Sequence, residues 1–233
     1  PSFSNSSSLS ITRALAKSGN NAKMSVNGSA TGCSYTIDYT FYPDGTVDMK
    51  VTFSPSETLA RIGLGMQFAS GFENVEFYAR GPRSNYSDRK TGSYLGRFTT
   101  TVDDMVDEMI HPQTFGDHED MRELILTNRA SNVQIGIKAG GRASFSLSHY
   151  DETKWCKSGD SMWNTNLHWY DLTRYQQVYA HFDYMQRGLG NNSCGGDSCL
   201  SDYVCPSYSS WNSSYGYTLR FTPQSGGNAR ITE

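Results

Sequence analysis

The sequence predicts an all-β protein built as an antiparallel sandwich. Aromatic residues make up 13% of its 233 residues, and runs rich in Ala, Leu, Glu and Lys are missing. Aromatic and β-branched side chains favour strands, and the abundant Gly, Ser and Asn favour the turns between them. Several segments also alternate apolar and polar residues, which is the pattern of a strand with one buried face.

Length, charge and missing motifs exclude several classes of protein. From the length, we expect one β-sandwich domain over residues 1–233. The net charge of -3 argues against a protein that binds nucleic acid. No apolar run reaches the roughly 18 residues of a membrane span. No phosphate-binding loop or βαβ alternation appears, which argues against a Rossmann fold and a complete TIM barrel.

The clearest strand pair is a hairpin. Apolar residues alternate with polar ones over Cys33–Phe41 and again over Val47–Phe53. Pro43-Asp44-Gly45 lies between the two runs, and a Gly-containing turn between alternating runs predicts a hairpin.

Other elements are expected from weaker patterns. Residues 1–31 predict a loose lead-in with at most a weak strand, and residues 188–214 a long loop. Val102, Met105, Val106 and Met109 have helical spacing but no clear cap. Further strands are predicted at Arg61–Ala69, Val75–Arg80, Leu124–Thr127, Val133–Lys138, Ala143–Tyr150, Tyr175–Asp183 and Tyr215–Phe221.

The cysteines and histidines do not outline a metal site. Cysteine spacings do not match zinc knuckles, so we expect no metal or other cofactor in this chain. One disulfide among Cys194, Cys199 and Cys205 is expected if the protein is exported. His118-Glu119-Asp120 suggests a metal or acid–base site, although a solvated loop is the favoured interpretation. His149 and His181 are expected to be satisfied core or edge residues.

The acidic residues do not form a convincing catalytic pair. Glycoside hydrolysis needs two carboxyl groups at a defined separation. The adjacent pairs Asp103-Asp104, Asp107-Glu108 and Glu119-Asp120 point to opposite faces if they lie on strands. From its residues alone, the chain predicts a domain without a complete active site.

Three motifs, in the right order, resemble the last domain (small-chain, domain 5-like) of glycoside hydrolase family 2 β-galactosidases: Tyr78–Arg89, Pro112–Leu124 and Phe182–Gly190. Leu59-Ala60-Arg61-Ile62-Gly63-Leu64 precedes them, and we call these four stretches the family-like segments. The resemblance covers roughly residues 35–222, most of the chain. Tyr78–Arg89 is similar to the family's G-P-x-E-N-Y-P-D-R signature, and Phe182–Gly190 to its I-D-x-x-x-x-G-x-G-G segment.

The resemblance implies a galactose-mutarotase-like super-sandwich within a larger enzyme. That enzyme would hydrolyse terminal β-D-galactosides with retention, using two glutamates in a TIM-barrel domain outside this chain. The family also implies Mg²⁺ or Na⁺ in the parent enzyme. We therefore expect no catalytic residue in this chain. We expect it to contact two partners, a galactoside and the catalytic domain of the same polypeptide.

A loop after the G-x-G segment carries the expected contact with sugar. In the family, the terminal domain closes over the barrel mouth, and this loop contributes to the galactose site. The matching residues are Asn191, Asn192, Ser193, Cys194 and Gly195. Cys194 stands where many members have Trp, and a thiol offers no wide apolar face to a sugar ring. We therefore expect a different aglycone preference.

The chain departs from the family pattern in three places. Ser84 replaces the usual Glu, and Ser87 replaces the usual Pro, which predicts a looser turn. Asn85, Asp88 and Arg89 are expected to hold this turn or a domain contact rather than sugar. The family's opening R-A-P-x-D-N-D stretch is missing, so we expect a sandwich truncated at its N-terminal edge.

Two other functions stay open at this stage. A free-standing carbohydrate-binding module needs exposed aromatic residues, for which Trp155, Trp163, Trp169 and Trp211 are candidates. An aldose mutarotase needs a His and a Glu that face each other in one cleft. The sequence predicts neither a nucleic-acid nor a membrane partner, and leaves open a homo-oligomer and either the periplasm or the cytoplasm of a bacterium.

Overall fold

The structure is a computed structural model that describes residues 8–10, 16–30, 32–110, 112, 114–154, 168–188, 199–205 and 214–225. Its strands are β1 (Ser8–Ser10), β2 (Ala16–Ser18), β3 (Asn21–Ala30), β4 (Cys33–Phe41), β5 (Val47–Pro55), β6 (Arg61–Phe68), β7 (Asn74–Gly81), β8 (Tyr94–Thr101), β9 (Glu123–Asn128), β10 (Val133–Gly141), β11 (Ser144–Ser148), β12 (Val178–Gln186) and β13 (Tyr215–Ser225). Single 3₁₀ turns are η1 (Asp103–Met105), η2 (Glu152–Lys154), η3 (Trp169–Asp171) and η4 (Ser201–Tyr203). Within these ranges no helix has the length and apolar composition of a membrane span.

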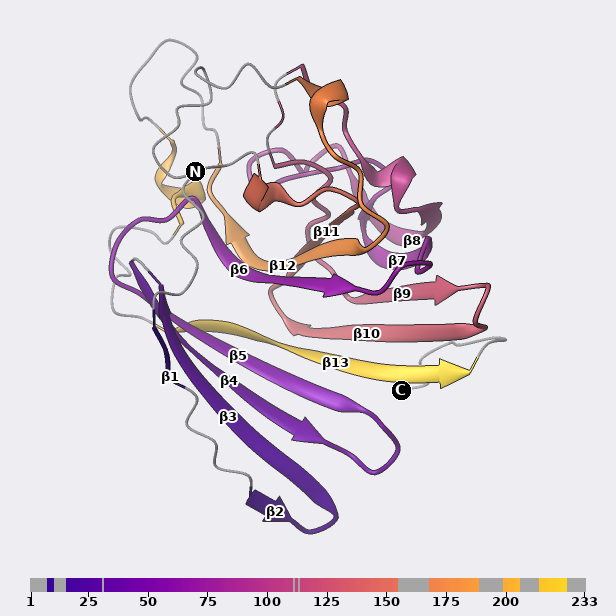
Figure 1. Cartoon of the computed structure of the whole chain (residues 1–233). Coiled ribbons are helices and arrows are strands. Elements are labelled where there is room, and N and C mark those ends of the chain that lie inside the picture. The colour runs from indigo at the N-terminus through magenta and orange to yellow at the C-terminus, as the bar shows by residue number, and fades with distance from the viewer. Residues whose placement is uncertain are drawn as a thin grey trace.

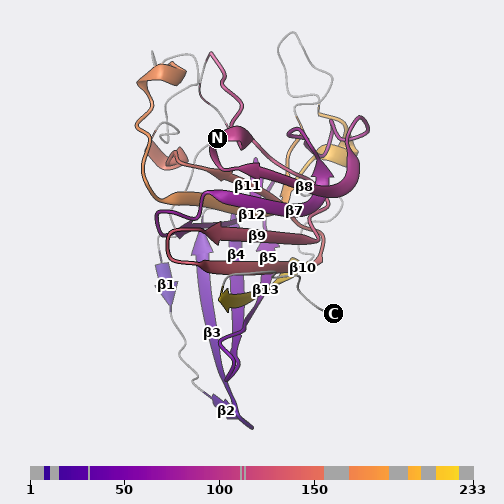
Figure 2. The same ribbon diagram turned by 90° about the vertical axis from the view of Figure 1, so that its right-hand side faces the viewer.

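The strands form two antiparallel sheets, as the sequence predicts. The large sheet has the order β1-β3-β4-β5-β13-β10-β9-β7-β8, with β2 also paired to β3, and the small sheet has the order β11-β12-β6. Figure 1 shows β6 and β12 above β9, β10 and β13, and Figure 2 shows the same layers from the side. β13 lies between β5 and β10 and joins the two halves of the large sheet.

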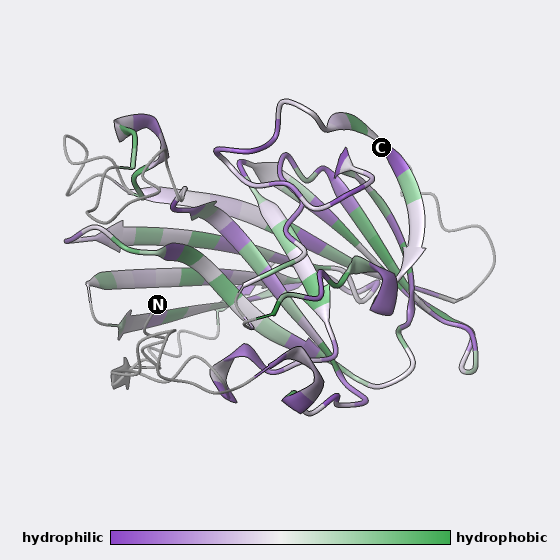
Figure 3. Cartoon of the chain, turned by 90° about the horizontal axis from the view of Figure 1, so that it is seen from above, coloured by the Kyte–Doolittle hydropathy of each residue, from purple (hydrophilic) through white to green (hydrophobic). Residues whose placement is uncertain are grey.

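Apolar side chains fill the space between the sheets. Hydrophobic and hydrophilic residues alternate along the strands in Figure 3, so each strand turns one face inward. Phe77 of β7 meets Phe145 of β11 edge-on, with ring centroids 5.5 Å apart, and Phe182 of β12 is also fully buried. Burying each such ring stabilises the fold by about 1.5–3 kcal/mol.

The predicted hairpin is confirmed. β4 pairs with β5 from Phe41↔Val47 to Cys33↔Pro55. Gly45 has φ +86°, which favours glycine, and the Thr46 N–H donates to Asp44 Oδ1 at 2.9 Å. The turn residues therefore set the register that places the apolar face of both strands inward.

The N-terminal segment differs from the expected loose lead-in. β3 is ten residues long and pairs with β4 from Ala22↔Phe41 to Ala30↔Cys33. Its small polar residues have low intrinsic strand propensity, but the edge of the β4–β5 hairpin supplies a ladder of hydrogen bonds. Tertiary pairing therefore overrides local composition here.

Two further elements differ from expectation. β8 was not predicted, because its outward-facing positions are exposed and its sequence is interrupted by Gly96. The helical spacing at 102–109 yields only the single turn η1. Val102 and Met105 are buried against the core, which accounts for their spacing without a longer helix.

Candidate functional site

An ion cluster joins two of the family-like segments at one end of the small sheet. Arg61 begins β6, and Asp183 lies in β12. The Arg61 Nε–H donates to Asp183 Oδ2 at 2.7 Å, and Nη1 donates to Glu152 Oε2 at 3.0 Å. Gly63 faces Asp183 across the strands, where a Cβ atom would lie 1.9 Å from Asp183 Oδ1. Glycine at that position therefore lets the carboxylate sit against the strand.

Burial controls the electrostatics of this cluster. The side chains of Arg61, Asp183 and Glu152 are 12%, 1% and 4% exposed. Burial opposes the charge of Arg61, but the carboxylates of Asp183 and Glu152 raise its pKa overall. Burial raises the pKa of Glu152, and Arg61 partly opposes that shift. The guanidinium therefore binds both carboxyl groups at a site that is largely buried.

A third acidic residue lies near this cluster without a hydrogen bond to its carboxyl group. Asp117 is fully buried, and neither of its carboxyl oxygens has a partner among the described residues. Burial, followed by the charges of Asp183 and Glu119, raises the pKa of Asp117 well above its usual value. Burial therefore disfavours the charged form of the Asp117 carboxyl group.

Asn85 connects the second and third family-like segments. It is fully buried, and its Nδ2 donates to the carbonyl oxygens of Arg80 and Arg83 at 3.0 and 3.1 Å. Its Oδ1 accepts the Glu119 N–H at 2.9 Å, and its own N–H donates to the Asp117 carbonyl at 2.7 Å. Each of these polar groups of Asn85 is hydrogen-bonded to another residue of the chain, so this side chain holds a turn.

The other two residues expected in that turn lie beside Asn85 in sequence. Arg89 places its guanidinium 5.1 Å from the centre of the Tyr86 ring, and the two residues exchange main-chain hydrogen bonds. Asp88 lies against Gly188, where a Cβ would be 2.8 Å from Asp88 Oδ2. The turn therefore reaches the end of β12. A contact of Asp88 or Arg89 with another domain stays a prediction.

We call the contacts around Gly188 the loop base, because they bring residues 188 and 199 together. The Gly188 N–H donates to the Tyr203 carbonyl at 3.0 Å, and the Cys199 thiol donates to the Gly188 carbonyl at 3.1 Å. Ser87 adds a third tie: its hydroxyl donates to the Gln186 carbonyl at 3.1 Å, a bond that proline could not make. The buried Ser87 hydroxyl thus anchors a turn that we expected to be looser.

The predicted sugar-contact residues follow the loop base. Asn191, Asn192, Ser193, Cys194 and Gly195 lie outside the described residues, as do Trp155, Trp163 and Trp211. Cys199 and Cys205 are free thiols, so no disulfide joins them. Burial and then Asp183 raise the pKa of Cys205 to about 12, so this thiol stays protonated.

The interpretation of His118-Glu119-Asp120 as a solvated loop is wrong for its first two residues. His118 is 2% exposed and lies between the rings of Phe77 and Phe145, at centroid distances of 4.7 and 5.3 Å. Glu119 is 3% exposed and accepts a hydrogen bond from Lys90 Nζ at 3.1 Å. Burial lowers the pKa of His118, which suits a neutral ring in the core.

Sequence reasoning missed Asp117 and Glu152 as members of this site. Asp117 lies inside the third family-like segment, so its position was a usable signal. Glu152 lies outside all four segments and is 91 positions from Arg61, so only the fold reveals it. In the described part of the chain, no group of three or more His, Cys, Asp or Glu residues is arranged to hold a metal ion.

Comparison with protein families gives one match over nearly the whole chain. The model of the family described as the β-galactosidase small chain matches residues 3–219. A β-galactosidase of Staphylococcus xylosus is 32% identical over 148 residues, which are 64% of this chain and 13% of that protein. A β-galactosidase of Priestia megaterium is 28% identical over 212 residues, which are 86% of this chain and 18% of that protein. The chain thus spans less than a fifth of these relatives.

Comparison with solved structures gives a distant likeness. A GalM/aldose epimerase homologue from Caenorhabditis elegans superposes with a TM-score of 0.48 at 10% sequence identity. The superposition covers 94% of this chain and 69% of that one.

Proposed function

Because this chain belongs to the β-galactosidase small-chain family, we propose that it is the C-terminal accessory domain of a β-galactosidase-like glycoside hydrolase. In this proposal it completes the substrate pocket of a catalytic domain in the same polypeptide. The loop that follows Gly188 is the part that reaches the sugar.

The loop base carries this proposal. Three of the four family-like segments meet there, through Ser87 with Gln186 and through Arg187, whose N–H donates to the Ala60 carbonyl at 2.9 Å. A loop whose two ends are held together presents its middle residues to a neighbour at a smaller entropic cost than an untied loop of equal length. The buried ion pairs of Arg61 with Asp183 and Glu152 lie at the same end of the small sheet as the loop base.

The chemical step would take place outside this chain. Retaining hydrolysis requires two carboxyl groups about 5 Å apart, one as nucleophile and one as acid and base. The buried carboxyl groups of Asp183 and Glu152 both bind the guanidinium of Arg61, so neither is free to act as a nucleophile or as an acid and base. We therefore propose that the chain alone is inactive, and that any Mg²⁺ or Na⁺ of the parent enzyme is held by the other domain.

Hydrolysis of a chromogenic β-galactoside tests the proposal. The purified chain is assayed alone, then with the upstream remainder of its polypeptide, and then with deletion of residues 191–195. We expect no turnover by the chain alone, activity on mixing, and loss of that activity with the deletion. A mixing control uses Lys50→Ala, an exposed residue of β5. Turnover by the chain alone would contradict the proposal.

The alternatives receive no support from the described residues. Trp169 packs on Phe115 and Tyr150 with ring centroids 5.4 and 4.7 Å away, so it is not an open platform for a sugar. The described His–Glu pairs are His149–Glu73 and His181–Glu152. His149 is fully buried and has both ring nitrogens bonded, and Glu152 is held by Arg61. Neither pair therefore places a free imidazole and a free carboxyl group together in one cleft.

A further inference from the structure

A polar pocket lies at the opposite end of the small sheet from the loop base. It has a volume of about 440 Å³ and is lined by Ser70, Gly71, Glu73, Asn128, Ala130, Arg174 and Gln176. β6 pairs with β12 from Gln186↔Arg61 to Val178↔Phe68, and the pocket follows Phe68. Eight residues of strand therefore separate it from the ion cluster, a distance of roughly 25 Å. Its volume lies in the range of small-molecule sites.

One wall of the pocket is fixed by close packing. Gly71 has φ +93°, and a Cβ there would lie 2.5 Å from Asn128 Nδ2. Asn128 Nδ2 donates to the Ser70 carbonyl at 3.3 Å, and Asn128 Oδ1 accepts the Ser131 N–H at 3.1 Å. These contacts hold Ser70, Gly71 and Asn128 in place relative to one another, and a wall that is already ordered lowers the entropic cost of binding.

A buried histidine orients the Glu73 carboxylate. His149 is fully buried, and because a carbonyl oxygen only accepts, its Nδ1 donates to the Gln177 carbonyl at 2.9 Å. Its Nε2 lies 2.7 Å from Glu73 Oε2, which is a hydrogen-bonding distance. Glu73 keeps its second carboxyl oxygen for the pocket, where its side chain is 39% exposed.

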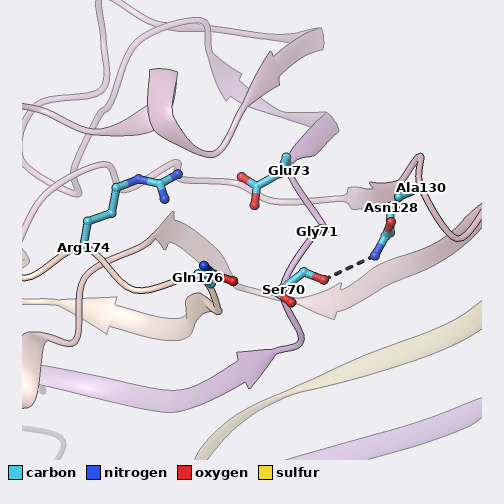
Figure 4. Close-up of a pocket in the computed structure, with 7 residues that line it drawn as sticks. All are labelled: Ser70, Gly71, Glu73, Asn128, Ala130, Arg174 and Gln176. Atoms are coloured by element: carbon cyan, nitrogen blue, oxygen red, sulfur yellow. Dashed lines mark hydrogen bonds between the residues drawn. The ribbon is translucent and has the colours of Figure 1, made fainter.

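Arg174 faces Glu73 across the pocket, as Figure 4 shows. Its Nε and Nη2 donate to Asp103 at 2.9–3.2 Å, which leaves Nη1 for another acceptor. Each charged side chain thus has a partner: Arg174 pairs with Asp103, and Glu73 with His149. The pocket offers strong donors and acceptors whose charges are paired, and its lining has no aromatic or large aliphatic side chain.

We propose that this pocket binds a small neutral polyhydroxylated ligand, such as one saccharide ring. A hydroxyl group both donates and accepts, so neighbouring hydroxyls can donate to Glu73 while accepting from Arg174 and the Gln176 carboxamide. The balanced charge disfavours an ion, and the lack of an apolar wall disfavours a hydrophobic ligand. Within the described residues, this site lies at the other end of the small sheet from the loop base.

An NMR titration of the intact chain tests the proposal. D-galactose is added up to about 100 mM while amide shifts are followed, because a pocket without stacking surface predicts millimolar affinity. We expect saturable shifts at Gly71, Glu73, Ala130 and Gln176. Sodium acetate at equal concentration is expected to leave these four amides unchanged.

Matched variants give the second arm of the test. Gln176→Leu is expected to weaken galactose binding about fivefold, and Glu73→Gln about tenfold, because each removes a hydrogen bond to the ligand. Gln67→Leu makes the same change at an exposed residue of β6, outside the lining, and should bind as the wild type does. Absence of shifts at the pocket, equal losses in the Gln176 and Gln67 variants, or tighter binding of acetate would overturn the proposal. Shifts confined to residues 188–205 would also overturn it, while supporting the proposed role of the loop.

Discussion

Replacing Arg61 by Met should be among the most destabilising single substitutions in this domain. Met fills much of the same volume but leaves the carboxylates of Asp183 and Glu152, 1% and 4% exposed, without their cation. Asp183 would retain the Gln186 amide at 3.3 Å, and Glu152 would retain His181 at 3.6 Å. Burial and then Arg61 lower the pKa of His181 to about 4 in the wild type, so that ring is neutral near pH 7. Breaking a buried ion pair in this way costs about 3–5 kcal/mol.

Urea unfolding at pH 7 measures this effect. With a slope of about 2–3 kcal/mol per M, the midpoint should fall by roughly 1–2 M. Arg220→Met is the matched control. It breaks a pair with Asp48 in which the Arg220 side chain is 51% exposed, and exposed pairs contribute about 1 kcal/mol or less.

At acid pH, the difference in unfolding free energy between Arg61→Met and the wild type should become smaller. A buried carboxyl group has a folded pKa above its unfolded value, so it binds its proton more tightly when folded and destabilises the fold as pH rises through that range. Lowering the pH from 7 to about 5 should therefore restore part of the lost stability. Asp183→Asn in the Arg61→Met background should do the same at pH 7. If Arg61→Met costs no more than Arg220→Met, the ion cluster does not have the role assigned to it here.

Three further predictions concern neighbouring residues. Asn85→Ala should lower the free energy of unfolding by about 2–4 kcal/mol in urea titrations, because it leaves the Glu119 N–H and two carbonyl groups unpaired. A loss below about 0.5 kcal/mol would contradict the structural role of Asn85. Asp117→Asn should flatten the pH dependence of Tm, because the wild type loses stability as pH rises from about 4 towards the raised folded pKa of Asp117. A profile parallel to that of the wild type would contradict a raised pKa at Asp117. Gly188→Ala should lower the free energy of unfolding by about 1–3 kcal/mol, since the new Cβ would lie 2.8 Å from Asp88 Oδ2 and Tyr203 Cβ. It should also reduce β-galactoside hydrolysis in the mixing assay. Unchanged stability and hydrolysis would argue against a packed loop base.

Local sequence patterns predicted the parts of the fold that local chemistry determines. The β4–β5 hairpin was predictable because its alternation and its Gly turn act over a few residues. β3 was not, since Ser, Asn and Gly give no strong local preference and its pairing with β4 supplies the order. His118 was assigned to a solvated loop because its acidic neighbours suggest exposure, whereas two phenylalanines from other strands enclose it.

The candidate site was predictable only as far as motif residues go. Asn85 was predicted to hold a turn or a domain contact. In the structure it bonds to Arg80 and Glu119 of its own domain, and a contact with another domain stays a prediction. The pairing of Arg61 with Asp183 joins residues 122 positions apart, a separation that no local pattern encodes. The pocket around Glu73 was not foreseen, because its lining comes from three separate connections that only the assembled sheets bring together.

The position of β13 has a consequence for biosynthesis. This strand is hydrogen-bonded to β5 through Tyr215↔Phe53 and to β10 through Val133↔Ser225, so it closes the large sheet from the far end of the sequence. During synthesis on the ribosome, β5 and β10 each have one edge without a hydrogen-bonding partner until residues 215–225 emerge. Such long-range closure slows folding and exposes strand edges to aggregation. Truncation before residue 215 should therefore yield two unjoined half-sheets rather than a slightly smaller domain.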